Sequence, residues 1–457
     1  MRGKSLYFVF ILIAYTVGIW TFSLIPKILM TAGLTGLALM AGFSIVIGAI
    51  ITIEVNSIMK KAYRVHEFMT KIGRTPTVSL VLLAFLFIVT SIIGHYTGVA
   101  LEKILGFTIP GVGIFVVLLG LLLLIMAKSK SLDLIVIFSV LLVILTIFAA
   151  TFLGSKVDDV VTKEASYQYI STTLTKLHTF TGEIPISMVV ETFLASLLTF
   201  GLGVGFYYVI GSSLATVNLD IRKILGIVIA LQIFLSFLAA LIVTYSIGIS
   251  HQAYWSAFEK GQAAEAMEVY NKYFRPLWKE YTSPERIEVK SLVETIFGIP
   301  EILKKLKIEG WFGFTLALML SIFLAGFTTI LVLLESGAQL AMDVFQISRK
   351  DSLVFVGVIS AILSGLGYFE PLRAVLVATI VTMIPIYSLV ELLPLMKVEE
   401  YRGKAIILMV ILIALWVPLI IAALRGGRDT AVLGMIVGGM LLIPLAFNKI
   451  LTRSPRG

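Results

Sequence analysis

The chain has 457 residues, of which 59% are hydrophobic and only 14% charged, whereas about a quarter of the residues in a soluble domain are charged. This composition excludes an ordinary soluble protein and indicates an integral membrane protein. The net charge of +9 is typical of a membrane protein with basic cytoplasmic loops, so nucleic acid is not expected as a partner. The absence of cysteine excludes disulfides and thiol chemistry.

Apolar segments long enough to cross the bilayer as helices follow one another along the chain. They predict an all-α fold with twelve spans near 6–29, 33–57, 77–102, 112–127, 131–154, 186–212, 223–250, 311–343, 351–368, 371–396, 404–424 and 429–449. Lys and Arg are concentrated in the short loops that share a side with the N-terminus. We therefore expect a multi-pass protein of the plasma membrane with both termini in the cytoplasm.

Two long connectors, 155–185 and 251–310, lie on the predicted outer side. Within the second connector, residues 256–274 have a helical composition, and residues 291–306 predict two short helices broken at Gly298–Pro300. These connectors are either solvated links or a lid over an external vestibule.

Spans one and six carry residues that weaken a helix at mid-membrane depth. Span one has Gly18 next to Tyr15 and Thr16, and span six has glycines at 201, 203, 205 and 211. Backbone groups freed there would cost several kcal/mol each unless polar partners meet them. Close helix packing alone could explain one such span, but two at matching places predict interrupted helices around a substrate and ion site. A single domain, 1–457, would then comprise inverted repeats of about 6–154 and 186–396, followed by 404–449.

Span eight places two hydroxyl groups one helical turn from a carbonyl. Thr328 and Thr329 follow Ala325 by three and four residues, so the three oxygens share a face. Oxygen ligands suit a hard cation. The alternative is that each hydroxyl bonds back to its own helix.

Three blocks of sequence resemble the neurotransmitter:sodium symporter family, of the kind represented by bacterial leucine and other amino-acid transporters. "LAGFTTI" in span eight, followed by an acid and "ISRK", is similar to the family's Ala-Gly-x-Thr-Ser block with its acid and Ser-Arg-Lys. "LLTFGLGVG" in span six and "VGIWTFSLIP" in span one resemble Phe-Phe-Thr-Leu-Ser-x-Gly-x-Gly and Val-Gly-Leu-Gly-Asn-x-x-Arg-Phe-Pro. The resemblance implies a carrier, not an enzyme, that takes up amino acids or related small amines with sodium ions by alternating access.

Carried over position by position, the resemblance implies two sodium sites. The first comprises the backbone carbonyls of Ala14, Val17 and Ala325 and the hydroxyls of Thr328 and Thr329. The second comprises Thr16, Thr21, Thr199 and Gln232, where Thr21 and Gln232 replace asparagines of the family.

The same comparison implies a rearranged substrate cavity, because Trp20, Gly201, Val204 and Val89 replace the family's Gly, Ser, aromatic gate and Tyr. The residues that the resemblance places around the substrate are Thr16, Ile19, Trp20, Leu198, Thr199, Gly201, Val204 and Leu333.

Charged residues near the ends of the spans are candidates for gates. We expect an external ion pair between Lys27 and Glu370, with Arg373 nearby, in place of the family's pair. At the inner side Asp343 matches the family's gate acid, with Arg2 or Lys4 as its partner. End-of-helix charges that reach toward water are the alternative.

Other polar residues within the spans leave a second mode of coupling open. Glu191, Glu335 and His95 could support proton coupling or exchange in place of sodium coupling, whereas Glu54 is expected to pair with Lys60 or Lys61. A channel or receptor is disfavoured, because the sequence has no charged ring or polar stripe and no added soluble domain.

Gly434 and Gly438 predict a face at which span twelve packs closely against another helix, and a homodimer is one option for that contact.

Overall fold

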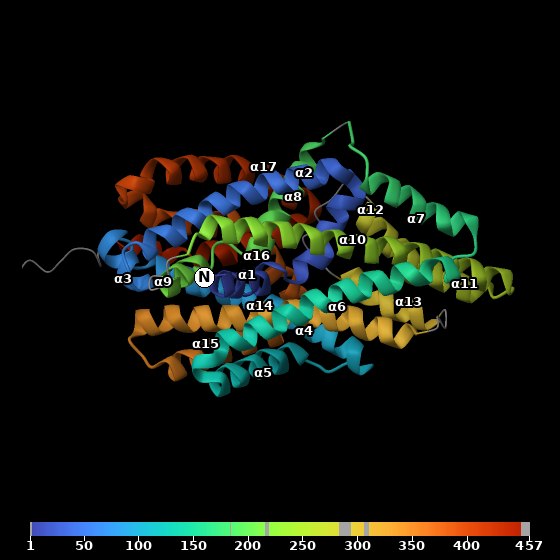
Figure 1. Cartoon of the computed structure of the whole chain (residues 1–457), viewed down its shortest axis with the longest axis horizontal. Helices are drawn as coiled ribbons and strands as arrows, with labels where there is room; N and C mark the ends of the chain where they lie inside the picture. Colours follow the sequence, from blue (N-terminus) through green and yellow to red (C-terminus); the bar gives the residue numbers. More distant parts are fainter. Residues whose placement is uncertain (1, 183, 215–218, 283–293, 306–309, 449–457) are drawn as a thin grey trace, which may run out of the picture.

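The structure is a computed structural model that describes residues 2–182, 184–214, 219–282, 294–305 and 310–448. The described part is a bundle of helices that run mostly along the long axis of the molecule (Figure 1). The helices that form the bundle are α1 (Arg2–Thr16), α2 (Ile19–Met59), α4 (Val78–Leu105), α5 (Val112–Ala127), α6 (Ser131–Val160), α8 (Ile186–Phe200), α9 (Phe206–Leu214), α10 (Ile221–Glu259), α14 (Trp311–Phe345), α15 (Arg349–Leu366), α16 (Glu370–Leu392) and α17 (Glu399–Met440).

The predicted membrane character is confirmed. Seven helices in the described part are long and apolar enough to cross a membrane, as expected for a multi-pass membrane protein. The predicted segments fall on helices, but α2 and α17 each run through two of them. Non-helical backbone divides α2 at Gly33 and α17 at Gly427, which marks the turns that the sequence places between spans.

Short helices cover both ends of the bundle. α7 (Glu164–Leu177), α11 (Ala263–Val269), α12 (Arg275–Thr282) and α13 (Ile299–Lys305) gather at one end, and α3 (Val65–Glu67) lies at the other (Figure 1). The helical structure predicted for residues 256–274 is confirmed over the end of α10, α11 and the π-helical turn Tyr270–Phe274. The predicted break at Gly298–Pro300 is the junction of a 3₁₀ turn, Glu294–Gly298, with α13. Residues 291–293 and 306 of that prediction lie outside the described residues.

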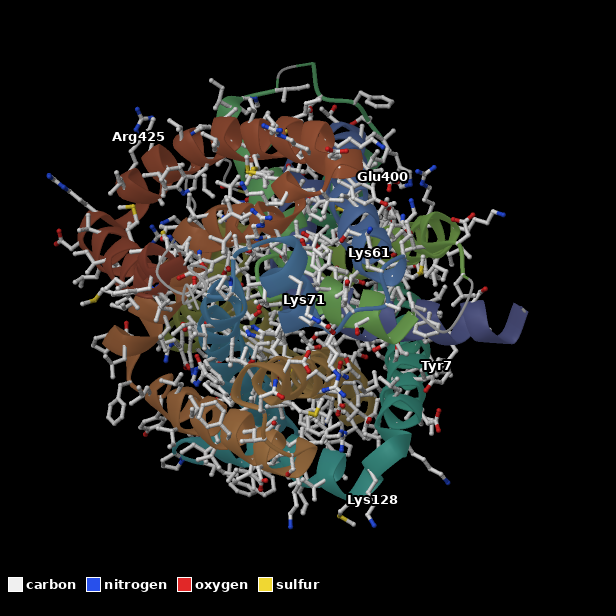
Figure 2. All side chains as sticks on the ribbon, turned by 90° about the vertical axis from the view of Figure 1, so that its left-hand side faces the viewer. Tyr7, Lys61, Lys71, Lys128, Glu400 and Arg425 are labelled. Atoms are coloured by element: carbon white, nitrogen blue, oxygen red, sulfur yellow. The ribbon has the colours of Figure 1, made fainter. Side chains whose placement is uncertain are left out.

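The end that carries α3 also carries basic residues of several predicted inner loops. Lys61, Lys71 and Lys128 lie there, together with Tyr7 from the start of α1 (Figure 2). Tyr7 donates a hydrogen bond of 2.8 Å to Asp133 Oδ1. This bond links α1 to α6 at the end of the bundle.

The turn at Gly33 is tied to the connector that follows α7. Gly33 has a φ of +53°, and a Cβ there would clash with the carbonyl oxygen of Lys176. The Leu34 N–H donates to the Thr179 carbonyl at 3.0 Å, and Gly33 forms an isolated bridge with Phe180. Only glycine fits this turn, because its conformation is left-handed and the connector backbone lies directly against it.

Gly434 and Gly438 pack inside the chain, against α16. A Cβ on Gly434 would lie 2.6 Å from the backbone carbon of Ala378, and the Tyr387 hydroxyl donates to the Gly438 carbonyl at 2.7 Å. The predicted packing face is therefore present, but its partner is α16. Because α16 covers these glycines, they do not offer a surface for a homodimer, and a homodimer through another surface stays a prediction.

Candidate ion and substrate site

Both predicted interruptions are present. α1 ends at Thr16 and α2 begins at Ile19, with Gly18 in extended conformation between them. α8 ends at Phe200 and α9 begins at Phe206. In this second break Gly201, Gly203 and Gly205 have φ values of +59°, +89° and +80°, a region that side chains with a Cβ rarely adopt.

Tyr15 joins the two breaks. Its hydroxyl donates to the Gly201 carbonyl at 2.6 Å, and its ring lies 4.0 Å from that of Phe206, centroid to centroid. A Cβ on Gly201 would clash with the Tyr15 hydroxyl, so these two residues depend on each other. The sequence analysis noted Tyr15 as an intramembrane polar residue but gave it no role.

Four of the five groups expected at the first sodium site come together. The hydroxyl oxygens of Thr328 and Thr329 lie 3.0 and 3.3 Å from the Ala14 carbonyl oxygen. They lie 3.2 and 2.9 Å from the Ala325 carbonyl oxygen. Val17, the fifth residue, lies in the break itself and is fully buried.

This cluster has more acceptors than donors. The Thr328 hydroxyl also lies 2.8 Å from the Leu324 carbonyl oxygen, so three carbonyls converge on hydroxyls that carry only two protons between them. Back-bonding of each threonine to its own helix, the alternative for these residues, therefore occurs together with the contact to Ala14. An oxygen-rich cluster of this kind is chemically suited to a hard cation.

The four residues expected at the second sodium site are less closely associated. The hydroxyls of Thr16 and Thr199 donate to the carbonyls of Leu12 and Ala195 within their own helices. Thr21 Oγ1 and Gln232 Oε1 are buried and make no hydrogen bond. Two buried oxygens thus lack partners, but no hydrogen bond connects any of the four expected residues with another.

A small cavity lies between the breaks, and its volume is about 20 Å³, enough for about one water molecule. Of the expected substrate residues, the cavity is lined by Trp20, Leu198, Gly201, Val204 and Leu333. Val89, expected in place of the family's pocket Tyr, also lines it. The remaining lining residues, which the sequence did not assign to the substrate, are Tyr15, Gly18, Ile93, Leu202, Thr329, Ile380 and Ile384.

Three expected substrate residues do not line this cavity: Thr16, Ile19 and Thr199. Ile19 instead faces α14, where a Cβ added to Gly326 would lie 2.9 Å from Ile19 Cδ1. The Trp20 side chain is 4% exposed and fills space that glycine would leave open.

Glu391 of α16 closes the second break, and sequence analysis missed it. Its carboxylate accepts hydrogen bonds from the N–H groups of Gly203 and Gly205, the latter at 2.9 Å. Glu391 is an acid inside an apolar span, the same signal that singled out Glu191 and Glu335. The expected pairing of Glu54 with a lysine was wrong, because Glu54 is fully buried while Lys60 pairs with Glu400 at 2.6 Å.

The external ion pair differs from the expected one. Lys27 Nζ lies 3.2 Å from Glu191 Oε1, and both side chains are largely buried. Glu370 is exposed at the start of α16, and Arg373 pairs with Glu294 at 2.9 Å. The prediction of Lys27 with Glu370 placed the partner on the wrong helix. Glu191 lies on α8 and Lys27 on α2, so the observed pair joins one half of each of the two broken helices.

At the opposite end Asp343 faces the start of α3. Its Oδ1 lies 4.0 Å from Arg64, and it accepts backbone hydrogen bonds from Val65 and His66. The expected partners Arg2 and Lys4 have side chains outside the described residues.

The other two residues considered for proton coupling also have neighbours that explain them. Arg349 binds Glu335 through two nitrogens, one of them at 3.2 Å. His95 packs against Tyr96, with 5.2 Å between ring centroids.

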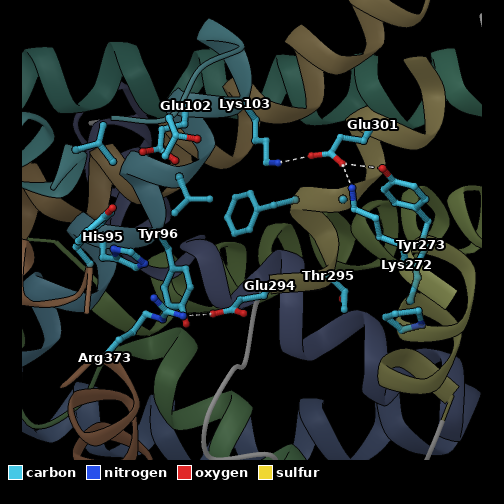
Figure 3. Close-up of a pocket in the computed structure, with 18 of the residues that line it drawn as sticks. His95, Tyr96, Glu102, Lys103, Lys272, Tyr273, Glu294, Thr295, Glu301 and Arg373 are labelled. Atoms are coloured by element: carbon cyan, nitrogen blue, oxygen red, sulfur yellow. Dashed lines mark hydrogen bonds and ion pairs between the residues drawn. The ribbon is translucent and has the colours of Figure 1, made fainter. Parts of the chain in front are cut away.

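A larger cavity of about 500 Å³ lies beside α4, α12, α13 and the start of α16, at the end expected to face outward (Figure 3). Lys103 reaches Glu301 at 2.7 Å across it, and Tyr273 also donates to Glu301. Burial pushes the pKa of Glu301 upward, but these bonds and the charge of Lys272 outweigh it and hold that pKa below its usual value. The helices of the second long connector are thereby fastened to α4.

Two helices broken in mid-span, which meet each other and a third helix, give this chain the fold of the neurotransmitter:sodium symporters. The chain is similar to the crystal structure of MhsT, a bacterial transporter of that family, in complex with L-phenylalanine. The TM-score is 0.55 at 16% identity, over 90% of this chain and 98% of that chain. At this identity the likeness establishes the fold. The sequence matches no protein-family model and no curated protein sequence.

Proposed function

We propose that this chain is a sodium-coupled secondary transporter of amino acids or related small amines. It would have twelve spans, a five-plus-five inverted repeat and both termini in the cytoplasm. The observation that carries the proposal is the contact of Thr328 and Thr329 with the Ala14 carbonyl, where an interrupted helix meets α14. A sodium ion at this cluster would hold α1 against α14, and its release would free them to separate.

The binding of L-phenylalanine by MhsT supports an amino acid or related amine as the substrate. In this chain the central cavity is far smaller than such a molecule, so Trp20 must move before one can enter. The carbonyl groups of the breaks would receive the amine, and the apolar lining would receive a short side chain.

Proton coupling on the same fold is the second candidate. Of the three residues first considered for it, Glu191 and Glu335 are held in ion pairs. This observation favours sodium as the ion that couples to substrate, with the hydroxyl cluster as its site.

Uptake by proteoliposomes tests the proposal. Labelled amino acids and small amines are supplied with and without an inward sodium gradient, to wild type and to Thr329→Val. We expect sodium-driven uptake in wild type, and sodium affinity lower by about 10–100-fold in the variant, the usual cost of disturbing an ion site.

Thr146→Val is the matched control, because Thr146 is also buried and its hydroxyl bonds only to Leu142 of its own helix. Uptake that follows a pH gradient and ignores sodium would overturn the proposal.

A further inference from the structure

Two buried carboxyl groups lie on the helices that pack around the second break. Glu54 of α2 and Glu391 of α16 are both 0% exposed. α2 packs against α9, since a Cβ on Gly211 would lie 2.8 Å from the carbonyl oxygen of Val55, and Glu391 bonds to the glycines just before α9. A negative charge on one of the two disfavours a negative charge on the other. Neither belongs to the oxygen cluster around Ala14. Their environments differ sharply, and that difference determines which of them can hold a negative charge.

Glu391 has the donors that a carboxylate needs. Its two oxygens accept from the N–H groups of Gly203 and Gly205, which precede the first turn of α9. Backbone donors at a helix N-terminus stabilise a negative charge through their hydrogen bonds and through the helix dipole. The Tyr208 hydroxyl donates to the backbone carbonyl of Glu391 at 2.8 Å, which fixes this residue against α9. These donors favour the charged form of Glu391 in this conformation.

Glu54 has no such donors. Neither of its carboxyl oxygens makes a hydrogen bond, and among the described residues neither carboxyl of the pair forms an ion pair with a base. A buried carboxylate without donors, beside a second negative charge, is strongly disfavoured. Its surroundings therefore favour the protonated, neutral form.

Among the residues that the structure describes, the other titratable groups that face the pair are tyrosines. Their hydroxyls are occupied, because each donates to a backbone carbonyl: Tyr15 to Gly201, Tyr207 to Phe200 and Tyr208 to Glu391. Among the described residues, the hydrogen bonds that stabilise a negative charge on the pair consequently come from the two N–H groups of the break. If α9 separates from α16, Glu391 loses both donors and becomes a buried charge without compensation.

We propose that Glu54 and Glu391 form a proton-binding site in which Glu54 is held neutral and Glu391 exchanges its two backbone donors for a proton when α9 separates from α16. The proton comes from water that enters the opened break, and it binds to a carboxylate oxygen of Glu391. When α9 returns, its amides displace the proton to water. This inference rests on the proposed function, because it requires the alternating conformations of a carrier.

The distance between α9 and α16 can be measured directly, because the chain has no native cysteine. Ser213→Cys at the exposed end of α9 and Lys397→Cys after α16 accept spin labels in the full-length protein. Pulsed electron paramagnetic resonance then gives the populations of the close and separated states as a function of pH. One proton per opening predicts that acid favours the separated state by up to about tenfold per pH unit.

Three variants distinguish the roles of the carboxyls. Glu391→Gln should fold, since its amide oxygen still accepts from one of the two N–H groups of the break, and its populations should lose their pH dependence. Glu54→Gln imitates a neutral Glu54 and should keep the wild-type dependence, as should the exposed control Glu400→Gln. A slope that persists in Glu391→Gln, or that disappears in Glu54→Gln, would overturn the proposal.

The same samples separate this inference from the sodium proposal. Thermal unfolding with and without sodium reports the site at Ala14 and Thr329. If sodium does not raise the melting temperature but the populations still depend on pH, the result counts against the sodium-coupled function alone. A flat pH slope in wild type with intact sodium stabilisation counts against the proton site alone.

Discussion

The break between α1 and α2 and the break between α8 and α9 use opposite kinds of backbone group. At the first, the Ala14 carbonyl meets the hydroxyls of Thr328 and Thr329, and acceptors are in excess. At the second, the N–H groups of Gly203 and Gly205 meet the carboxylate of Glu391. The excess acceptor oxygens at the first break are therefore suited to bind a cation from solution. The second supplies its own anion and needs no substrate carboxylate at these amides.

The largest loss of stability is expected on replacing Glu391. Replacing Glu391 by Ala leaves two buried N–H groups without acceptors, at about 1–3 kcal/mol each. We expect the free energy of unfolding to fall by about 2–6 kcal/mol, measured by denaturant titration in detergent. Glu400→Ala removes an exposed acid and serves as the control. Equal stability of Glu391→Ala and wild type would mean that the second break is satisfied by other groups.

Trp20 gives the next largest effect. Trp20→Gly removes the indole from the small cavity and should cost about 3–5 kcal/mol in the absence of ligand. The enlarged cavity should bind L-leucine or L-phenylalanine more tightly than wild type, and the amino acid should restore the melting temperature. Phe22→Ala is the matched control, because Phe22 is fully buried but does not line this cavity. If the amino acid restores the melting temperature of both variants, or of neither, then Trp20 does not select the substrate.

The ion pair of Lys27 with Glu191, which joins the two broken helices, gives the third effect. Either Lys27→Glu or Glu191→Lys should lower stability by about 1–3 kcal/mol, between the values for exposed and buried pairs. The double swap should restore most of the loss in thermal unfolding. Glu370→Lys should have little effect, because Glu370 is exposed. If Glu370→Lys is as harmful as Glu191→Lys, the external pair involves α16 after all.

Glu301 gives the smallest effect, and it depends on pH. Because its pKa is held below the usual value, its bonds to Lys103 and Tyr273 stabilise the fold fully above the unfolded pKa of about 4.3. The contribution is lost as the pH falls through the lower pKa of the folded protein. Relative to the intrinsic exchange rate at each pH, hydrogen exchange of α13 should therefore become faster at low pH in wild type, and Glu301→Gln should show this faster exchange already at neutral pH. Exchange that is the same in both at neutral pH would exclude this role for Glu301.

The positions of the breaks followed from the sequence because backbone chemistry is local. Glycines at 18, 201, 203 and 205 mark them directly, since few other residues tolerate the left-handed conformation that three of these positions adopt. The neighbours of Thr328 and Thr329 could be stated in advance through their spacing from Ala325 and the family resemblance. Their use as a sodium site remains a prediction.

The partners of charged side chains could not be predicted in the same way. Whether Lys27 meets Glu191 or Glu370 depends on how each helix is rotated about its axis, and apolar residues on all sides of a span leave that rotation undetermined. The same uncertainty concealed the burial of Glu54. Gly434 and Gly438 showed that a close contact exists, but their spacing carries no information on which helix makes it.

The turn at Gly33 couples the first interrupted helix to the connector that follows α7. Because the backbone after α7 is bonded to this turn, we expect any tilt of that helix to carry the connector along with it. A nanobody bound to α7 should then slow the helix movements that the proposed transport requires, although α7 contributes no residue to the hydroxyl cluster or to the central cavity.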